Sequence, residues 1–256
     1  MKFKKLLSIA LASAMVLGVA GCSSSGDTAS SSGAATESGD KAVKIKLAGI
    51  YAAETGESQA MYKFKELIEA KSDSITVEVY PNCQLGNEET LTDGVRQGNV
   101  EMAVTGSTWA QYMPYMAIGE YAFLFDGWDS AKTALTNEEI VADITQGGTE
   151  AGVQVLGMNP AGFRVITSNK PIEKMEDYKG FRLRVPNIPQ YLTMAELLGA
   201  TPVAMSLSEL FTGLEQKVVD GQENPFSTII ANKFYEVQPY AINTKHMLTA
   251  HIWTMN

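Results

Sequence analysis

The sequence predicts an α/β protein, in which strands and helices alternate along the chain. Between residues 43 and 80, two stretches with apolar side chains at every second position flank a stretch with apolar side chains at helical spacing. A strand, a helix and a second strand in this order form a parallel pair joined by a crossover. The chain has 256 residues, of which 45% are hydrophobic, so it has enough apolar material to bury a core.

The first α/β block begins at Val43, where apolar residues alternate with lysines in a predicted strand. A helix follows, with Ser58 as its expected N-cap. Its apolar stripe consists of Met61, Phe64, Leu67 and Ile68. The second strand spans residues 75–80, and a second helix is expected to start after the N-cap Asn87. A third strand, residues 100–105, completes the block.

Residues 109–128 contain many aromatic and methionine side chains that follow neither the helical nor the strand period. Packing in the core is the expected role of this stretch. The alternative is that Trp109 and Tyr112 form walls of a ligand pocket, and Trp109 is kept as a candidate ligand-binding residue for that reason.

A second α/β block is expected from Gly162, which opens the predicted strand GFRVITS. The next strand is FRLRVP, residues 181–186, and a helix from about residue 190 to 198 follows it. Ser206 and Glu209 then fit a capping box in front of a further helix. The repeated order of strand and helix supports the same α/β class for this half of the chain.

The N-terminus has the features of a lipoprotein signal peptide. Three lysines among the first five residues precede an uncharged stretch, residues 6–20, which is too short for a membrane helix of about 20 apolar residues. The stretch ends in VAGC, which resembles the bacterial lipobox. Residues 1–21 are therefore expected to be removed and Cys22 to be lipidated. The alternative is an ordinary secreted protein with an unmodified cysteine.

Residues 22–40 have no large apolar side chain and are expected to form a flexible, lipid-anchored linker. Lipidation of Cys22 leaves Cys83 alone, so no intrachain disulfide is expected. Removal of residues 1–21 takes three of 20 basic side chains and leaves 17 against 29 acidic ones, a net charge of −12. This charge argues against nucleic acid as a partner, and an anionic ligand needs a local cluster of donors.

Two of the four arginines lie in the predicted strand FRLRVP, where Arg182 and Arg184 share one face and the apolar residues take the other. Arginines there can be solvated or paired with the acids of residues 173–177. Arg184 lies at the carboxyl end, where open α/β sheets bind ligands, and a helix N-terminus follows near Pro189. Its planar guanidinium suits a carboxylate, which makes Arg184 the preferred candidate for binding an anion.

Several motifs occur in a familiar order and spacing, namely YPNCQLG, TSNKPI, FRLRVP, LGATPV, VDGQENP and KFYEVQ. Together they resemble the solute-binding proteins of tripartite ATP-independent periplasmic (TRAP) transporters, specifically the dicarboxylate-receptor family. The similarity runs from about Val43 to the end of the chain. It implies a two-lobed α/β clamshell of the periplasmic-binding-protein type, with lobe I formed by residues 41–161 and 250–256 and lobe II by residues 162–249.

The resemblance implies a receptor that binds an organic acid and delivers it to the small and large integral membrane subunits of a permease. The expected location is extracytoplasmic, with the lipid at Cys22 anchoring a monomer to the cell membrane. No cofactor and no metal are expected. The organic acid stays open among C4-type dicarboxylates, sugar acids and 2-oxo acids, since each presents a carboxylate.

The resemblance also implies site residues. The family's carboxylate-binding arginine falls on Arg184, a second family arginine on Arg164, and the ligand-contacting asparagine of the QENP motif on Asn224. Arg164 has the alternative role of an interdomain salt bridge, and residues 222–224 the alternative of shaping a turn. Glu223 is left out of the site, because an acid beside an anion is costly unless it points away or pairs.

Three departures from the family pattern qualify this reading. Leu207 stands where these receptors often have a phenylalanine beside the ligand, and Leu207 is therefore included in the site. Gly106 stands where some sugar-acid receptors have an acidic contact, so a different ligand is expected. Family members continue through several C-terminal helices, which are expected to be missing here because the sequence stops at Asn256, as a fragment or a premature stop would.

Other classes are weighed against the TRAP receptor. A receptor of the ABC-transporter class or a sensory ectodomain has the same general fold, and the motifs argue against both. An enzyme acting on a small organic acid is the remaining alternative. His246 and His251 fit no standard zinc spacing, no histidine motif accompanies Cys83, and GxSxG, GxGxxG and P-loop patterns are missing. The expected class is therefore a binding protein and not an enzyme.

Overall fold

The computed structural model describes residues 42–256. The predicted signal peptide, the lipidation of Cys22 and the whole of the predicted linker lie outside the described residues. Within residues 42–256 no helix combines the length and the apolar composition that crossing a bilayer requires.

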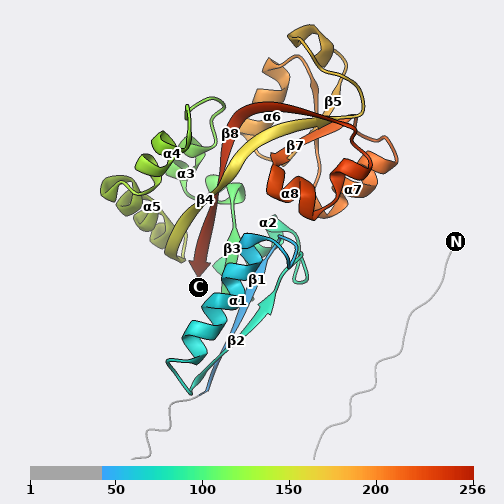
Figure 1. Ribbon diagram of the computed structural model, residues 1–256. Coiled ribbons are helices and arrows are strands. Elements are labelled where there is room, and N and C mark those ends of the chain that lie inside the picture. The colour runs from blue at the N-terminus through green and yellow to red at the C-terminus, as the bar shows by residue number, and fades with distance from the viewer. Residues whose placement is uncertain (1–41) are drawn as a thin grey trace, which may run out of the picture. The chain divides into compact units, whose positions relative to one another are not determined.

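One mixed sheet organises the described residues, with the strand order β2-β1-β3-β8-β4-β7-β5-β6 (Figure 1). The strands are β1 (Val43–Gly49), β2 (Ile75–Tyr80), β3 (Met102–Thr105), β4 (Gln154–Ser168), β5 (Arg182–Val185), β6 (Thr201–Ala204), β7 (Gly221–Pro225) and β8 (Tyr240–Met255). The α-helices are α1 (Gly56–Glu69), α2 (Glu88–Arg96), α3 (Pro114–Gly119), α4 (Trp128–Leu135), α5 (Glu138–Glu150), α6 (Pro189–Leu197), α7 (Leu207–Glu215) and α8 (Phe226–Ala231). Three 3-10 helices complete the list: η1 (Ser107–Gln111), η2 (Met175–Tyr178) and η3 (Phe234–Glu236).

The first block follows the predicted order. β1 pairs in parallel with β2 and β3, and α1 and α2 are the crossovers between them. Asn87 caps α2 as predicted, because its side chain accepts the backbone N–H of Thr90 at 2.9 Å. The predicted N-cap of α1 is wrong: Thr55 occupies that position and accepts the N–H of Ser58 at 3.3 Å, while the Ser58 hydroxyl donates to the carbonyl of Tyr51 at 3.0 Å.

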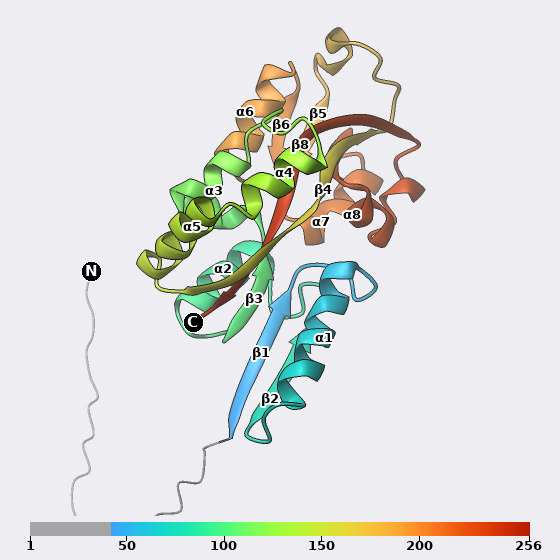
Figure 2. The ribbon, with the colours of Figure 1, turned by 60° about the vertical axis from the view of Figure 1, so that its left-hand side comes forward.

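The central strands β4 and β8 are the longest, with 15 and 16 residues, and pair antiparallel along their length (Figure 2). They join the β2-β1-β3 part of the sheet to the β7-β5-β6 part. The predicted lobe boundaries, at 161/162 and 249/250, fall inside these two strands, so each strand passes from one predicted lobe into the other. A register shift interrupts the β4–β8 ladder between Pro160 and Gly162. The boundaries themselves stay a prediction.

The second block places β5 between β6 and β7 in parallel pairing. β7 carries the QENP motif, and each of its residues is buried. The alternative that residues 222–224 shape a turn is therefore wrong. Gly221 is required by close packing, because a Cβ atom there would lie 2.2 Å from the carbonyl oxygen of Thr167.

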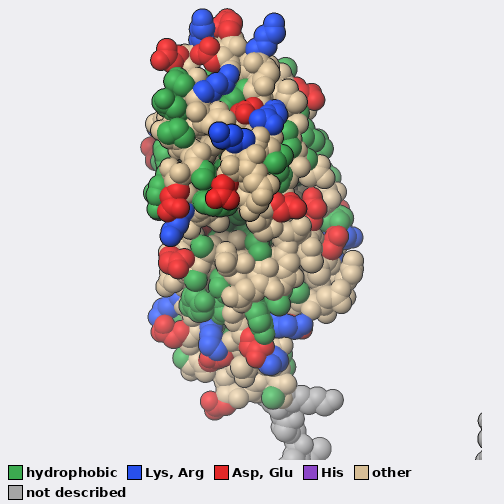
Figure 3. Space-filling model, turned by 90° about the vertical axis from the view of Figure 1, so that its right-hand side faces the viewer, with side chains coloured by type: hydrophobic (Ala, Val, Ile, Leu, Met, Phe, Trp, Pro, Cys, Tyr) green, Lys and Arg blue, Asp and Glu red, His purple; other side chains and the backbone are tan. Residues whose placement is uncertain are grey.

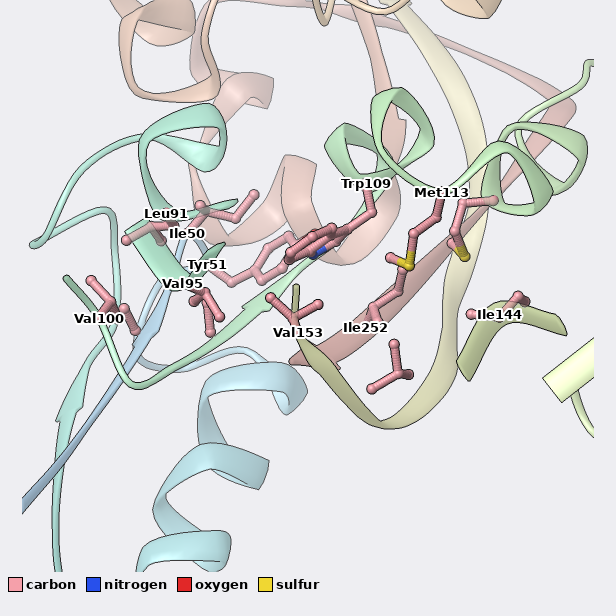
Figure 4. Packing of buried hydrophobic residues seen from close by; sticks show 14 residues of the cluster. Ile50, Tyr51, Leu91, Val95, Val100, Trp109, Met113, Ile144, Val153 and Ile252 are labelled. Carbon is pink, nitrogen blue, oxygen red and sulfur yellow. The ribbon is translucent and has the colours of Figure 1, made fainter. Parts of the chain in front are cut away.

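Apolar residues cover both faces of each part of the sheet. Successive residues of β1, Leu47 and Ala48, join different buried clusters, and so do Val165 and Ile166 of β4, as the strand period of two requires. Figure 4 shows the cluster formed around Trp109 by residues of β1, α2, η1 and β8 with several neighbours. Four such clusters hold the fold, two in each part of the sheet.

Candidate functional site

A cavity of about 310 Å³ lies at the carboxyl ends of β1, β5 and β6. Its first wall consists of Ile50, Cys83, Asn87, Glu88, Glu89 and Thr108. Its second wall consists of Arg184, Pro186, Asn187, Ala204, Met205, Ser206, Leu207 and Glu209. The position agrees with the rule that ligands of open α/β sheets bind beyond the carboxyl ends of strands. The volume suits a small molecule.

Arg184 is the cation of this cavity. Arg184 is only 3% exposed to solvent, yet within the described part of the chain its guanidinium pairs with no carboxylate. Nε and Nη2 donate to the carbonyl oxygen of Met205 at 2.8 and 2.5 Å. Burial lowers the pKa of Arg184 to about 10, so the side chain is still charged at neutral pH. A buried positive charge therefore faces the cavity with a backbone carbonyl as its partner.

Three carboxylates line the same cavity, those of Glu88, Glu89 and Glu209. Glu88 accepts the backbone N–H of Gly106 at 2.8 Å and the hydroxyl of Thr108 at 3.2 Å. A Cβ atom on Gly106 would lie 3.1 Å from the carbonyl oxygen of Ala250, which is a tight contact, while its distance of 3.5 Å from the Glu88 carboxylate would be an ordinary one. Sequence reasoning missed Glu88, although its place directly after the N-cap Asn87 was a usable signal.

Arg164, the second predicted ligand-binding arginine, lies in a closed polar cluster instead of the cavity wall. Nη2 donates to the Glu223 carboxylate at 2.8 Å and to the Glu223 carbonyl at 2.7 Å, Nε donates to the same carboxylate, and Nη1 donates to the Thr249 hydroxyl at 2.8 Å. His246 Nε2 lies 3.3 Å from the carboxylate. Burial is the largest single effect and would raise the pKa of Glu223, but the charge of Arg164 and the hydrogen bonds of His246 and Arg164 together outweigh it, so the pKa is lowered.

This cluster resolves the expectation for Glu223. Glu223 pairs with a cation, which is one of the two ways in which an acid near the site avoids the cost of its charge. Its partner is Arg164 on the neighbouring strand β4. Arg164 therefore forms a salt bridge, as its alternative role predicted. The bridge joins two adjacent strands, β4 and β7. Arg182 likewise pairs with Asp220, at 2.7 Å between Nη2 and the carboxylate, and not with the expected acids of residues 173–177.

The remaining predicted site residues divide between the cavity and the interior. Leu207 lines the cavity. Asn224 lies behind it, where Nδ2 donates to the Gln222 side chain at 2.6 Å and Oδ1 accepts from Arg164 at 3.1 Å. Trp109 is fully buried within the apolar cluster shown in Figure 4. Its indole N–H donates to the Thr105 hydroxyl at 2.8 Å. The expected role of core packing is therefore confirmed for Trp109, and the alternative that it forms a pocket wall is wrong.

Other chemistry-bearing groups are sparse around the cavity. Burial raises the pKa of the Cys83 thiol to about 11, which keeps it protonated and poorly nucleophilic at neutral pH. Among residues 42–256 no group of three or more His, Cys, Asp or Glu is placed to hold a metal ion. On the face shown in Figure 3, basic and acidic side chains are interspersed and form no continuous basic surface over the described residues.

Comparisons with known proteins give a consistent result. Residues 47–256 match the family described as bacterial extracellular solute-binding protein, family 7. A TRAP periplasmic solute-binding protein from Haemophilus influenzae, solved with bound L-gulonate, is 36% identical, has a TM-score of 0.80, and is matched over 84% of this chain and 71% of its own. One from Roseobacter denitrificans with bound L-galactonate is 33% identical, with a TM-score of 0.80 over 84% of this chain and 72% of its own.

A curated relative, the 2,3-diketo-L-gulonate-binding periplasmic protein of Escherichia coli, is 30% identical over 77% of this chain and 61% of its own length. An uncharacterized protein of Haemophilus influenzae is 40% identical over 73% of this chain and 57% of its own length. The chain thus spans 57% to 61% of the length of these two curated relatives.

Proposed function

Because the chain belongs to family 7 of the bacterial extracellular solute-binding proteins, we propose that it is the receptor of a TRAP transporter for an organic acid anion. The predicted fold class, an α/β two-lobed binding protein, is confirmed by the solved relatives. The receptor binds its ligand in the cavity around Arg184 and delivers it to the membrane permease.

The observation that carries this proposal is the unpaired charge of Arg184. A guanidinium has five N–H donors, and the Met205 carbonyl uses two of them, from Nε and Nη2. The three other donors lie on Nη1 and Nη2, and this pair of nitrogens can donate two parallel hydrogen bonds to a carboxylate. A buried cation without a counter-ion is costly, and an anion that enters the cavity removes this cost. Each charge-assisted hydrogen bond then contributes about 1.5–3 kcal/mol.

The acidic groups of the cavity narrow the ligand class to hydroxylated monocarboxylates. Glu88 and Glu89 on the first wall repel a second carboxylate but accept hydrogen bonds from hydroxyl groups. Sugar acids combine one carboxylate with several hydroxyls and fit this polarity better than C4-dicarboxylates do. L-gulonate and L-galactonate, the ligands of the two solved relatives described above, are acids of this kind.

The remaining features of the proposal come from the resemblance and the N-terminal sequence. The partners are the small and large membrane subunits of a TRAP permease. The receptor is an extracytoplasmic lipoprotein anchored through Cys22 and acts as a monomer. A lipid anchor with a flexible linker lets the receptor reach the permease along the membrane.

Calorimetric titration with L-gulonate, L-galactonate and succinate tests the proposal. We expect at least one acid to bind at a 1:1 ratio, and Arg184→Ala to lower its affinity by about 10²- to 10³-fold, because a desolvated charge partner is lost. Arg182→Ala is the matched control, since Arg182 lies two residues away and pairs with Asp220. Unchanged affinity in Arg184→Ala, or no binding of any of the three acids, would reject the proposal.

A further inference from the structure

A second group of buried polar side chains, Glu120, Tyr191 and Ser107, lies next to the ion pair of Arg164, whose guanidinium is 5.0 Å from the centre of the Tyr191 ring. The Tyr191 hydroxyl donates to the Glu120 carboxylate and lies 3.0 Å from the Ser107 hydroxyl. The three residues are almost completely removed from solvent, with Glu120 only 1% exposed. They come from three elements that are distant in sequence: Glu120 follows α3, Tyr191 lies on α6, and Ser107 opens η1.

These elements belong to opposite sides of the ligand cavity. Thr108 of η1 is part of the first wall, and Asn187, just before α6, is part of the second wall. A neighbouring crevice of about 250 Å³ is lined by Ser107 and Thr108 from one side and by Asn187 and Gln190 from the other. The hydrogen bonds of Tyr191 therefore connect elements of the two walls, at residues to which the proposed function assigns no role.

We propose that Glu120, Tyr191 and Ser107 form a latch that holds the two walls together, and that a proton on Glu120 stabilises the closed arrangement. The inference rests on the proposed function, because a receptor must separate its walls to admit and release a ligand. Tyr191 and Glu120 are positioning residues in this account: they touch neither the cavity lining nor the ligand, and act by keeping Arg184 opposite the first wall.

The surroundings of Glu120 explain why its charge opposes closure. From α6 it faces the phenol of Tyr191, from β4 the cation Arg164, and from α2 the carboxylate of Glu88. From α5, Asp143 shares an apolar cavity with Glu120, and the β8 residues that line the same cavity, Leu248 and Ala250, are uncharged. Burial raises the pKa of Glu120 from 4.5 to about 7, against the lowering effects of the Tyr191 hydrogen bond and of Arg164.

The direction of the pH effect follows from this raised pKa. A group with a higher pKa in the closed form stabilises that form fully below its pKa in the open form. The stabilisation is lost as the pH rises from about 4.5 through about 7, at roughly tenfold per pH unit in the ratio of closed to open molecules. Glu120 keeps its hydrogen bond to Tyr191 whether it is protonated or charged. The cost of closure at high pH is therefore the cost of burying the charge of Glu120.

Small-angle X-ray scattering of the ligand-free chain at about pH 5 and about pH 8 tests the latch, because linkage predicts a higher ratio of closed to open molecules at the lower pH. We expect a smaller radius of gyration at the lower pH. Glu120→Gln mimics the protonated carboxyl and should stay compact at both pH values. Tyr191→Phe loses both bridging hydrogen bonds and should be expanded at both. The exposed variants Glu139→Gln and Tyr121→Phe are matched controls that should behave as the unmodified chain.

Circular dichroism confirms that each variant is folded before its radius is interpreted. A radius of the unmodified chain that does not change with pH overturns the inference, and so does a pH response that persists in Glu120→Gln. Because no ligand is used, failure of the latch is distinguished from failure of the proposed function, which the Arg184 titration tests.

Discussion

Two arginines on either side of strand β7 are buried to a similar degree and differ in how their charge is compensated. Arg164 on β4 binds the carboxylate of Glu223, while Arg184 on β5 binds the carbonyl of Met205 and faces a cavity. Both strands pair with β7, so the two side chains share one neighbourhood. A buried cation with its own carboxylate is complete without a ligand. One without a carboxylate is left available for an anion from outside, and under the proposed function this separates the structural Arg164 from the ligand-binding Arg184.

The largest expected effect comes from breaking the compensated pair. Arg164→Met leaves Glu223 buried without its cation and should lower the free energy of unfolding by about 3–5 kcal/mol. Urea denaturation measures this loss. Adding Glu223→Gln to Arg164→Met removes the orphaned charge and should recover much of the stability. If Arg164→Met alone is as stable as the unmodified chain, the ion pair of Arg164 and Glu223 does not stabilise the fold.

A smaller effect is expected from the acid that faces Arg184 across the cavity. Glu88→Gln keeps an oxygen to accept the Gly106 N–H but loses the negative charge. We expect about 1–1.5 kcal/mol weaker binding of L-gulonate, since a charged acceptor becomes neutral, and stronger binding of succinate. Calorimetry gives both affinities, with Glu139→Gln as a control on exposed surface. Equal changes for the two acids would contradict the role of Glu88 in selecting hydroxylated ligands.

The smallest effect on stability is expected from replacing Arg184, although this arginine is buried. Arg184→Met removes the cost of burying a charge that has no carboxylate partner. This gain in stability offsets the loss of two hydrogen bonds to Met205. The free energy of unfolding without ligand should therefore change by less than about 1 kcal/mol. A loss as large as that of Arg164→Met, measured in the same urea titration, would show that Arg184 is structural as well.

Local patterns in the sequence predicted most of the secondary structure. The alternation that starts at Val43 became β1, Asn87 capped α2, and the FRLRVP stretch became β5 with Arg184 at its carboxyl end. Each of these depends on residues within a few positions of one another. The N-cap of α1 was misplaced by three residues because Thr55 and Ser58 are both good capping types, and the competing bond of Ser58 to Tyr51 is not a sequence signal.

The partners of charged side chains were much harder to predict. Arg164 and Glu223 are 59 positions apart, Glu88 and Gly106 are 18 apart, and Tyr191 and Glu120 are 71 apart. Trp109 was assigned to a pocket wall as an alternative and lies in the core, because the number of neighbours around an aromatic ring is a property of packing.

The sequence by itself determined the α/β order, the family and the residue type that is proposed to meet the carboxylate, since these follow from short-range periodicity and from motifs. Only the tertiary structure decided which of two buried arginines is left without a carboxylate, where Glu88 faces it, and that Glu120 meets Tyr191 beside the cavity. The physical reason is that the energy of a buried charge depends on what lies within a few ångströms, and the folded sheet, not the order of residues, sets those distances.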